Sequence, residues 1–493
     1  MSEPEHSVFL QDETCVKRCP SSYVAQSSDT TADLISLFSD RVTVDTLPDD
    51  VLLEIFGSYK DDHANRKQFT WTWTILAQVC QRWRRLILES PRHLDLQLVC
   101  TPATPTRRLL DFLPRFPIIV CSSFSSHPRM AGVENLITAL ERRDRTSQIY
   151  ISDIQPSELP ELIAVMNKPY PILTTFSLMM TTYDSVLPKT FLGGSAPSLR
   201  SFTLTDIQFP TFPEFILSST HIVYLSLCRV GYISPEVMAS CLAALPKLRC
   251  CLIQPQSPLT HTSKQNAPPL TFAVLPALTH LFFYGVGQYF EALVAQMDTP
   301  ILKRLSLTFP ISALDIPRLH GFVDRIESLG PFGRANMEIS GWRIEMTLGS
   351  PTRFKLAFQC EVQDRKVSLM TEVFSQQLGL LSHVEQLEIC VPSWEDNDLV
   401  INSSLLELFR LFIAVQSLYV SEKLVATVAA ALKELTVERA MEVFPALCNL
   451  YLEGLRSSGS VQELINSFVA SRQLSGHPVN IQSWERQRAD DNS

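Results

Sequence analysis

Few residues of this 493-residue chain have the type and spacing that chemistry requires. Cys15 and Cys19 could supply two thiolates to zinc, but no second ligand pair at zinc spacing accompanies them, so we interpret them as unrelated cysteines. Gly285-Val286-Gly287 is similar to the start of a dinucleotide-binding loop, which needs a small residue where this chain has Phe290. We therefore predict no metal site and no cofactor.

The usual motifs of intrinsic catalysis are missing from the sequence. There is no Gly-x-Ser-x-Gly turn to expose a nucleophilic serine, no Gly-x-x-x-x-Gly-Lys loop for phosphates and no His-Glu-x-x-His pair for a catalytic zinc. The ten histidines form no obvious ligand set. We expect a protein that has no catalytic residues and acts by binding.

Charge and hydropathy limit the classes of partner. The chain has 42 basic and 51 acidic residues, a net charge of −9, so no overall positive field attracts nucleic acid or anionic lipid. The basic run Arg82, Arg84, Arg85 and Arg92 has no accompanying aromatic ladder and favours a solvated helix face. No apolar run reaches the roughly 18 residues of a membrane span. We expect no nucleic-acid or membrane partner, and a cytoplasmic or nuclear location.

The first part of the chain predicts a small helical module. Residues 1–44 are polar and rich in Ser, Thr and acids, which favours a mostly disordered tail. Leu47-Pro48-Asp49-Asp50 then predicts a helix start, because proline suits the first helical position and acids suit the first turn. From Val51 to Phe56 only Glu54 is polar, so this helix needs cover on more than one side.

A further helix is predicted from Thr74 to Ser90, where Pro91 ends it. Its apolar face carries Val79, Cys80 and Trp83, and its other face carries the arginines. A short alternating run follows, consisting of Leu94, Leu96 and Leu98.

Later in the chain a short apolar pattern recurs. Nine anchor residues are each followed by apolar residues at positions +3 and +5, and successive anchors are 23 (Leu199 to Ile222) to 32 (Val415 to Leu447) residues apart, except across one long gap. The anchors are Leu173, Leu199, Ile222, Leu248, Leu278, Leu302, Val384, Val415 and Leu447. Six of them stand two residues after a proline, which can stop a helix at a corner that needs no backbone donor. Helical patterns lie between the strand-like positions, so we predict stacked strand–helix units.

Two stretches interrupt this pattern. Between Leu302 and Val384, alternating apolar residues on both sides of a turn at 349–353 predict a β-hairpin over 342–360, which either replaces ordinary repeats or projects from the array. Residues 256–269 contain three prolines and no apolar period, and they predict a surface loop.

Residues 45–98 are very similar to an F-box. The resemblance rests on Leu47-Pro48, Ile55-Phe56, Val79-Cys80, Trp83 and Ser90-Pro91 in the order of that family, although the link between Phe56 and Val79 is several residues longer than usual. Residues 146–482 resemble the longer strand-plus-helix variety of the leucine-rich-repeat superfamily, in an irregular form. An F-box followed by irregular repeats resembles large fungal F-box families.

The resemblances imply an α+β chain with five parts. These are a tail at 1–44, an all-α three-helix F-box at 45–98, a linker and first helical cap at 99–145, an irregular α/β leucine-rich-repeat solenoid at 146–482 that includes the hairpin, and a tail at 483–493.

The F-box resemblance implies the substrate-recognition subunit of a Skp–cullin–F-box E3 ubiquitin ligase. The F-box would dock on a Skp-type adaptor, itself attached to a cullin with a RING subunit, and the repeats would hold an unknown protein substrate for ubiquitin-dependent degradation. A non-ligase F-box scaffold is the alternative that the sequence leaves open. The predicted adaptor-binding residues are Leu47, Pro48, Val51, Leu52, Ile55, Phe56, Val79 and Trp83.

The repeats also predict where a substrate binds. In each copy the residue between +3 and +5, and the residue just before +3, point away from the core, so stacked strands place them in rows on the concave face. The rows mix aromatic and polar side chains with an arginine, which interface hot spots favour. The predicted residues are Tyr224, Ser226, His280, Phe282, Arg304, Ser306, Gln386, Glu388, Ser417, Tyr419, Asn449 and Tyr451.

Overall fold

The computed structural model divides into two compact units, unit 1 from Met1 to Leu94 and unit 2 from Asp95 to Ser493. The described residues are 44–64, 72–91, 93–94, 96–113, 116–122, 133–152, 154–181, 185–256, 272–310, 316–360, 363–376, 378–392, 405–435, 439–454 and 459–485. The predicted tail up to residue 43, with Cys15 and Cys19, lies outside this part, as do all but the first residue of the predicted 256–269 loop and residues 486–493.

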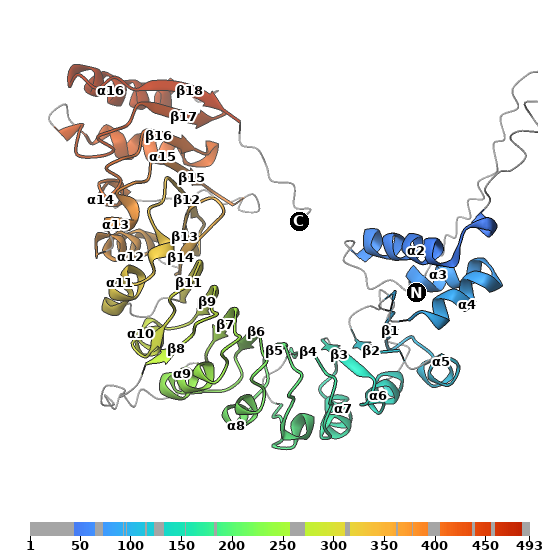
Figure 1. Cartoon of the computed structure of the whole chain (residues 1–493). Coiled ribbons are helices and arrows are strands. Elements are labelled where there is room, and N and C mark those ends of the chain that lie inside the picture. The colour runs from blue at the N-terminus through green and yellow to red at the C-terminus, as the bar shows by residue number, and fades with distance from the viewer. Residues whose placement is uncertain are drawn as a thin grey trace, which may run out of the picture. The chain divides into compact units, whose positions relative to one another are not determined.

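Unit 1 is built of helices (Figure 1). Its elements are η1 (Val44–Thr46), α2 (Asp49–Ala64), α3 (Thr72–Val79) and α4 (Gln81–Glu89). Leu52 and Phe56 of α2 are buried, together with Leu86 and Ile87 of α4. The Phe56 ring lies 4.7 Å from the Trp83 ring, centroid to centroid, so an aromatic contact joins the first helix to the last.

The helix predicted from Thr74 to Ser90 is two helices, which corrects the sequence-based prediction. Cys80 has extended backbone dihedral angles, φ −154° and ψ 170°, and its Sγ accepts a hydrogen bond from the backbone N–H of Trp83. Cys80 therefore caps α4 and ends the helix before it. Val79 and Trp83, predicted on one helix face, belong to different helices and have different surroundings.

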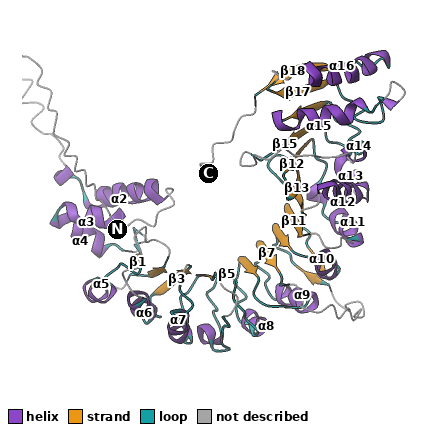
Figure 2. Ribbon diagram, turned by 180° about the vertical axis from the view of Figure 1, so that it is seen from behind, coloured by secondary structure: helices purple, strands orange, loops and turns teal. Residues whose placement is uncertain are grey.

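Unit 2 is a mixed α/β repeat array. Sixteen of its described strands form one mostly parallel sheet that lines the inner side of an arc, and the helices cover the outer side (Figures 1 and 2). The strands of this sheet are β1 (Leu98–Cys100), β2 (Ile118–Cys121), β3 (Thr146–Ile151), β4 (Thr175–Met179), β5 (Ser201–Thr205), β6 (Tyr224–Cys228), β7 (Cys250–Gln254), β9 (His280–Tyr284), β11 (Arg304–Pro310), β12 (Arg334–Ile339), β13 (Arg343–Leu348), β14 (Phe354–Gln359), β15 (Gln386–Cys390), β16 (Ser417–Val420), β17 (Asn449–Glu453) and β18 (Asn480–Trp484). A second, two-stranded sheet pairs β8 (Ala273–Val274) with β10 (Met297–Asp298).

Helical elements separate most of these strands along the chain. They are α5 (Thr106–Phe112), α6 (Glu134–Leu140), α7 (Leu159–Met166), η2 (Phe191–Gly194), α8 (Phe212–Leu217), α9 (Pro235–Ala243), α10 (Gly287–Val294), α11 (Pro317–Asp324), η3 (Glu327–Leu329), α12 (Gln363–Gln376), α13 (Leu378–Leu381), α14 (Leu405–Phe409), α15 (Glu422–Lys433) and α16 (Gly459–Leu474). No helix in the described part of the chain is both long and apolar enough to cross a membrane.

The recurring proline occupies the same turn in all six of its copies. In each copy the N–H of the anchor donates to the C=O of the residue just before the proline, for example Leu199 N to Ala196 O at 3.1 Å and Leu302 N to Thr299 O at 3.2 Å. Proline thus stands at the second position of a β-turn, where its fixed φ fits and no N–H is needed. The turn ends each helical stretch and directs the chain into the next strand.

The +3 and +5 residues form the core because neighbouring strands keep their register. Phe176 pairs with Phe202, Phe202 with Leu225, and Leu281 with Leu305, so residues at position +3 form a continuous buried row. Since the side-chain period of a strand is two, position +5 forms a second buried row on the same face. The residues between them face the inner side of the arc.

The predicted hairpin replaces ordinary repeats within the sheet. β13 pairs antiparallel with β14, and the order along the sheet is β11-β14-β13-β12-β15. After β11 the chain passes to β12, which pairs parallel with β15, and the hairpin then fills the space back to β11. Of these strands only β13 runs against its neighbours.

The sheet begins earlier than the sequence indicates. The region 99–145, expected as a linker and first helical cap, contains strand β2, helices α5 and α6 and two of the three residues of β1. Leu98, assigned to the F-box by resemblance, begins β1 and is buried, and Ser483 and Trp484, assigned to the tail, belong to β18. All four residues of β2 are buried, so this strand has no apolar–polar alternation by which to recognise it.

Gly193 provides a stability test of the η2 turn. Its φ is +73°, and a Cβ there would lie 2.7 Å from the backbone N of Pro169. Gly193→Ala combines backbone strain with a steric clash, and we expect it to lower the free energy of unfolding by about 2 kcal/mol or more. Gly231→Ala is the matched control, since Gly231 has φ +96° with nothing within 4 Å of its Cβ position. Equal losses in urea unfolding would contradict a role for the close approach.

Candidate functional site

Unit 1 exposes apolar side chains that its own core does not use. Val51 and Ile55 of α2 are 39% and 46% exposed, and Ile75 and Val79 of α3 are 56% and 58% exposed. Each pair has i, i+4 spacing, so each helix presents two neighbouring apolar side chains on one face. Ile75 was not predicted, although its position four residues before Val79 is a signal for it.

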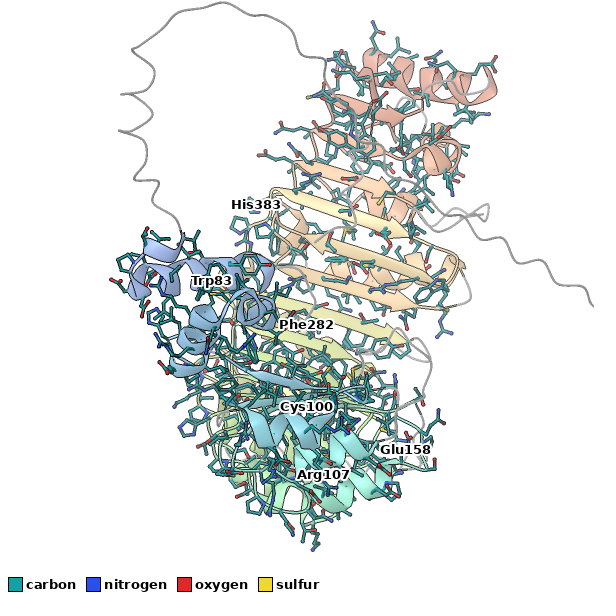
Figure 3. All side chains as sticks on the ribbon, turned by 90° about the vertical axis from the view of Figure 1, so that its right-hand side faces the viewer. Trp83, Cys100, Arg107, Glu158, Phe282 and His383 are labelled. Carbon is teal, nitrogen blue, oxygen red and sulfur yellow. The ribbon has the colours of Figure 1, made fainter. Side chains whose placement is uncertain are left out.

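The other predicted adaptor-binding residues have varied surroundings. Leu52 and Phe56 are buried in the core of unit 1, and Pro48 is exposed. Leu47 and Trp83 are partly buried, and Trp83 (labelled in Figure 3) packs on Phe56.

Two arginines of the predicted basic run hold the helices together. Arg82 donates to a carboxylate oxygen of Asp49 and, at 2.6 Å, to the carbonyl oxygen of Leu47, so it ties α4 to the start of α2. Arg84 donates through Nε to the carbonyl oxygen of Ala77, 3.0 Å away. These contacts give Arg82 and Arg84 a structural role in unit 1.

The predicted substrate-binding residues from Tyr224 to Ser306 lie together on β6, β9 and β11 of the inner face of unit 2. Tyr224, His280 and Arg304 lie in one row, in which Cys250 stands between Tyr224 and His280. The Arg304 guanidinium lies 5.5 Å from the centroid of the Phe282 ring (labelled in Figure 3), close enough for a cation–π contact.

The two predicted serines contribute little to this surface. Ser226 and Ser306 are 5% and 9% exposed, because larger residues flank them on the neighbouring strands: Leu252 beside Ser226, and Phe282 and Lys355 beside Ser306.

Cys250, which stands between Tyr224 and His280, has a raised pKa. Burial raises the pKa of its thiol by more than nearby Arg304 lowers it. This cysteine is therefore a neutral thiol at physiological pH.

Two of the remaining predicted residues, Tyr419 and Tyr451, form an aromatic cluster with Trp484 on β16–β18. The rings of Tyr419 and Tyr451 stack with centroids 4.4 Å apart and an interplanar angle of 6°, and Trp484 meets Tyr419 edge-on at 5.4 Å. Burial raises the pKa of the Tyr419 hydroxyl, and nearby Tyr451 adds to the effect. The sequence pattern missed Trp484, which lies on a strand without a recognised anchor.

The polar predicted residues flank this cluster. Glu388 pairs in register with Tyr419, and Gln386, Ser417 and Asn449 form the adjacent row. All of these side chains are at least partly exposed.

The inserted strands separate the two halves of the inner face. Across β14, β13 and β12, acidic and basic side chains pair with each other: Glu345 with Arg343 and Lys355, and Glu388 with Arg334 at 3.2 Å. The predicted single concave row is therefore two sectors, one on β5–β11 and one on β15–β18, with a charge-paired zone between them.

The remaining candidate motif has a packing role. Gly285 lies where a Cβ would be 3.0 Å from the Phe283 ring and 3.2 Å from Pro255, and Phe290 is completely buried. The glycine therefore permits close packing at the end of β9. Within the described ranges, no group of three His, Cys, Asp or Glu residues is placed to hold a metal ion.

Comparison with known proteins yields little. No protein-family model matches the sequence, and no curated protein matches it. Among solved structures, the leucine-rich-repeat protein LIC12759 of Leptospira interrogans is 12% identical, and the match covers 71% of this chain and 91% of that chain, with a TM-score of 0.22. We base the repeat architecture on the strand registers and turns of this chain.

Proposed function

We propose that this protein is the substrate-recognition subunit of a Skp–cullin–F-box ubiquitin ligase. In this proposal unit 1 is an F-box that docks on a Skp-type adaptor, and the inner face of unit 2 holds a protein substrate. The chain itself is non-catalytic and uses no cofactor, since the transfer of ubiquitin belongs to the assembled ligase.

The single observation that carries the proposal is that α2 and α3 each expose two apolar side chains, Val51/Ile55 and Ile75/Val79. The core of unit 1 is already filled without them. Leu52, Phe56, Leu86 and Ile87 provide that core, so burying the exposed pairs adds nothing to the fold of unit 1. Four exposed branched apolar side chains on so small a unit favour a protein partner, since each buried Å² of apolar surface contributes about 25 cal/mol. The order of F-box elements around these helices supports a Skp-type adaptor as that partner.

The decisive experiment is adaptor binding by a double variant. We expect Ile55→Glu/Val79→Glu to weaken binding of a purified Skp-type adaptor about 100-fold or more, because it places two charges within the proposed apolar interface. Isothermal titration calorimetry with the full chain measures the effect.

The matched control is Ser240→Glu/Gln473→Glu, which adds the same charge at exposed polar positions on α9 and α16, outside unit 1. We expect this control to bind the adaptor as the unmodified chain does. Both variants should keep the far-ultraviolet circular dichroism of the unmodified chain. Unchanged adaptor affinity in Ile55→Glu/Val79→Glu would refute the F-box assignment.

A ligase subunit and a non-ligase scaffold differ in what happens to the bound protein. Affinity purification from cells with and without proteasome inhibition separates them. A substrate receptor should recover the adaptor, the cullin and a protein that accumulates when the proteasome is inhibited. Recovery of the adaptor with partners whose amounts do not respond would favour the scaffold.

A further inference from the structure

One edge of the inner face in unit 2 is basic. Arg200, Arg249 and Lys303 each stand immediately before a strand, β5, β7 and β11 respectively, and all three are exposed. Backbone hydrogen bonds align these positions: Thr279 N donates to Arg249 O at 2.9 Å, and Lys303 N donates to Thr279 O at 2.8 Å. The three cations therefore lie along the N-terminal ends of alternate strands in the run β5-β6-β7-β9-β11.

Arg304 extends this charge onto the inner face itself. It lies over the Phe282 ring, and its Nε is buried without a hydrogen-bond partner. Within the described part of the chain, Arg200, Arg249, Lys303 and Arg304 make no ion pair with a carboxylate. A partly exposed guanidinium without a carboxylate partner is suited to a ligand that supplies one.

Acidic residues are missing from the strands of this sector. β4, β5, β6, β7, β9 and β11 contain no Asp or Glu. Beyond them, on β12–β15, Glu345 and Glu388 neutralise the nearby cations. The chain as a whole carries a net charge of −9, so this edge is a local positive field on an acidic protein.

We propose that the β5–β11 sector binds an extended acidic segment of a partner protein. The carboxylates of that segment pair with Arg200, Arg249, Lys303 and Arg304, and its apolar side chains contact Tyr224 and Phe282. This inference rests on the proposed function in one respect, namely that unit 2 is the part of the chain that holds a protein. It adds the chemistry of the bound segment, which is acidic.

The spacing of the cations matches an extended peptide. Arg200 and Arg249 are two strands apart, as are Arg249 and Lys303. Strands lie about 4.8 Å apart, so neighbouring cations are separated by about 10 Å, the length of about three extended residues. We therefore expect acidic residues at about every third position of the bound segment.

Charge density favours an acidic peptide over nucleic acid. The cations lie in a single line that spans five strands, about 19 Å, whereas nucleic-acid sites neutralise many phosphates over a broad positive surface. A net charge of −9 also repels a dense polyanion at longer range.

The test is selection from a random 12-residue display library with the full chain as bait. We expect the selected peptides to be enriched in Asp and Glu. A resynthesised selected peptide should bind about tenfold or more weakly to Arg249→Glu/Lys303→Glu, which reverses two charges of the edge. At 0.5 M NaCl the enrichment should disappear, because salt screens exposed charges.

The control variant is Arg107→Glu/Arg318→Glu, with the same change in net charge at exposed positions on α5 and α11. It should select and bind the same peptides as the unmodified chain. The proposal is overturned by a selection without acidic enrichment, by enrichment that survives in Arg249→Glu/Lys303→Glu, or by competition in which polyuridylic acid displaces the peptide at lower concentration than a glutamate-rich peptide does. Adaptor binding by the same variants is measured separately, so failure of the F-box assignment remains distinguishable.

Discussion

Phe283→Ala is expected to lower the free energy of unfolding of unit 2 by about 3–5 kcal/mol. Phe283 is 3% exposed, and its ring centroid lies 5.1 Å from that of Phe290 and 6.0 Å from that of Phe309. These rings connect β9, α10 and β11, so truncation leaves a cavity between two successive repeats. Because repeats are stabilised mainly by their neighbours, the loss extends to both repeats.

The control for this prediction is the adjacent residue of the same strand. Phe282 is also a phenylalanine but faces the inner side of the arc, so Phe282→Ala should cost about 1 kcal/mol or less. Urea unfolding gives the difference between the variants, and hydrogen exchange of the β9 and β11 amides locates it. Similar losses for the two variants would show that the two faces of β9 are equally packed, contrary to the assignment of the core.

Arg472→Met is expected to destabilise the last repeat by about 3 kcal/mol or more. Arg472 of α16 is completely buried, and its guanidinium donates at 3.2 Å to the carbonyl oxygens of Ala440, Pro445 and Leu447. Methionine fills similar volume but leaves all three carbonyl groups without this donor, and each buried unsatisfied polar group costs about 1–3 kcal/mol.

The control is Arg439→Met, because Arg439 is exposed and pairs with Glu442 at the surface. Solvent screens an exposed ion pair of this kind, so this change should be nearly neutral. Faster hydrogen exchange in β17 and α16 should accompany Arg472→Met alone. Protection equal to that of the unmodified chain would mean that other donors replace the guanidinium.

The sequence alone identified the repeats, because their signal is local. Each anchor, its +3 and +5 residues and the preceding proline lie within eight residues, and the turn at the proline needs no distant partner to form. The residues predicted between the core positions do lie on the inner face for the same reason, since alternation along a strand depends on the backbone alone.

Tertiary structure decided which of these local units are neighbours. The hairpin at 342–360 is evident from alternation, but its position between β11 and β12 depends on pairing between residues distant in sequence. That insertion divides the inner face into a basic sector and an aromatic sector. It also places Glu345 beside Arg343 and Lys355, which neutralises the zone between the sectors.

The same distinction explains the candidate adaptor surface in unit 1. Sequence indicated an apolar helix from Val51 to Phe56 that needs cover, but the identity of the covered residues depends on the packing of α4 against it. Trp83 contacts Phe56 from α4, the helix that begins after the break at Cys80. The sequence shows that Val51, Ile55 and Val79 are apolar, because hydrophobicity belongs to each residue. Whether they are buried depends on how the helices pack, and in unit 1 they remain exposed.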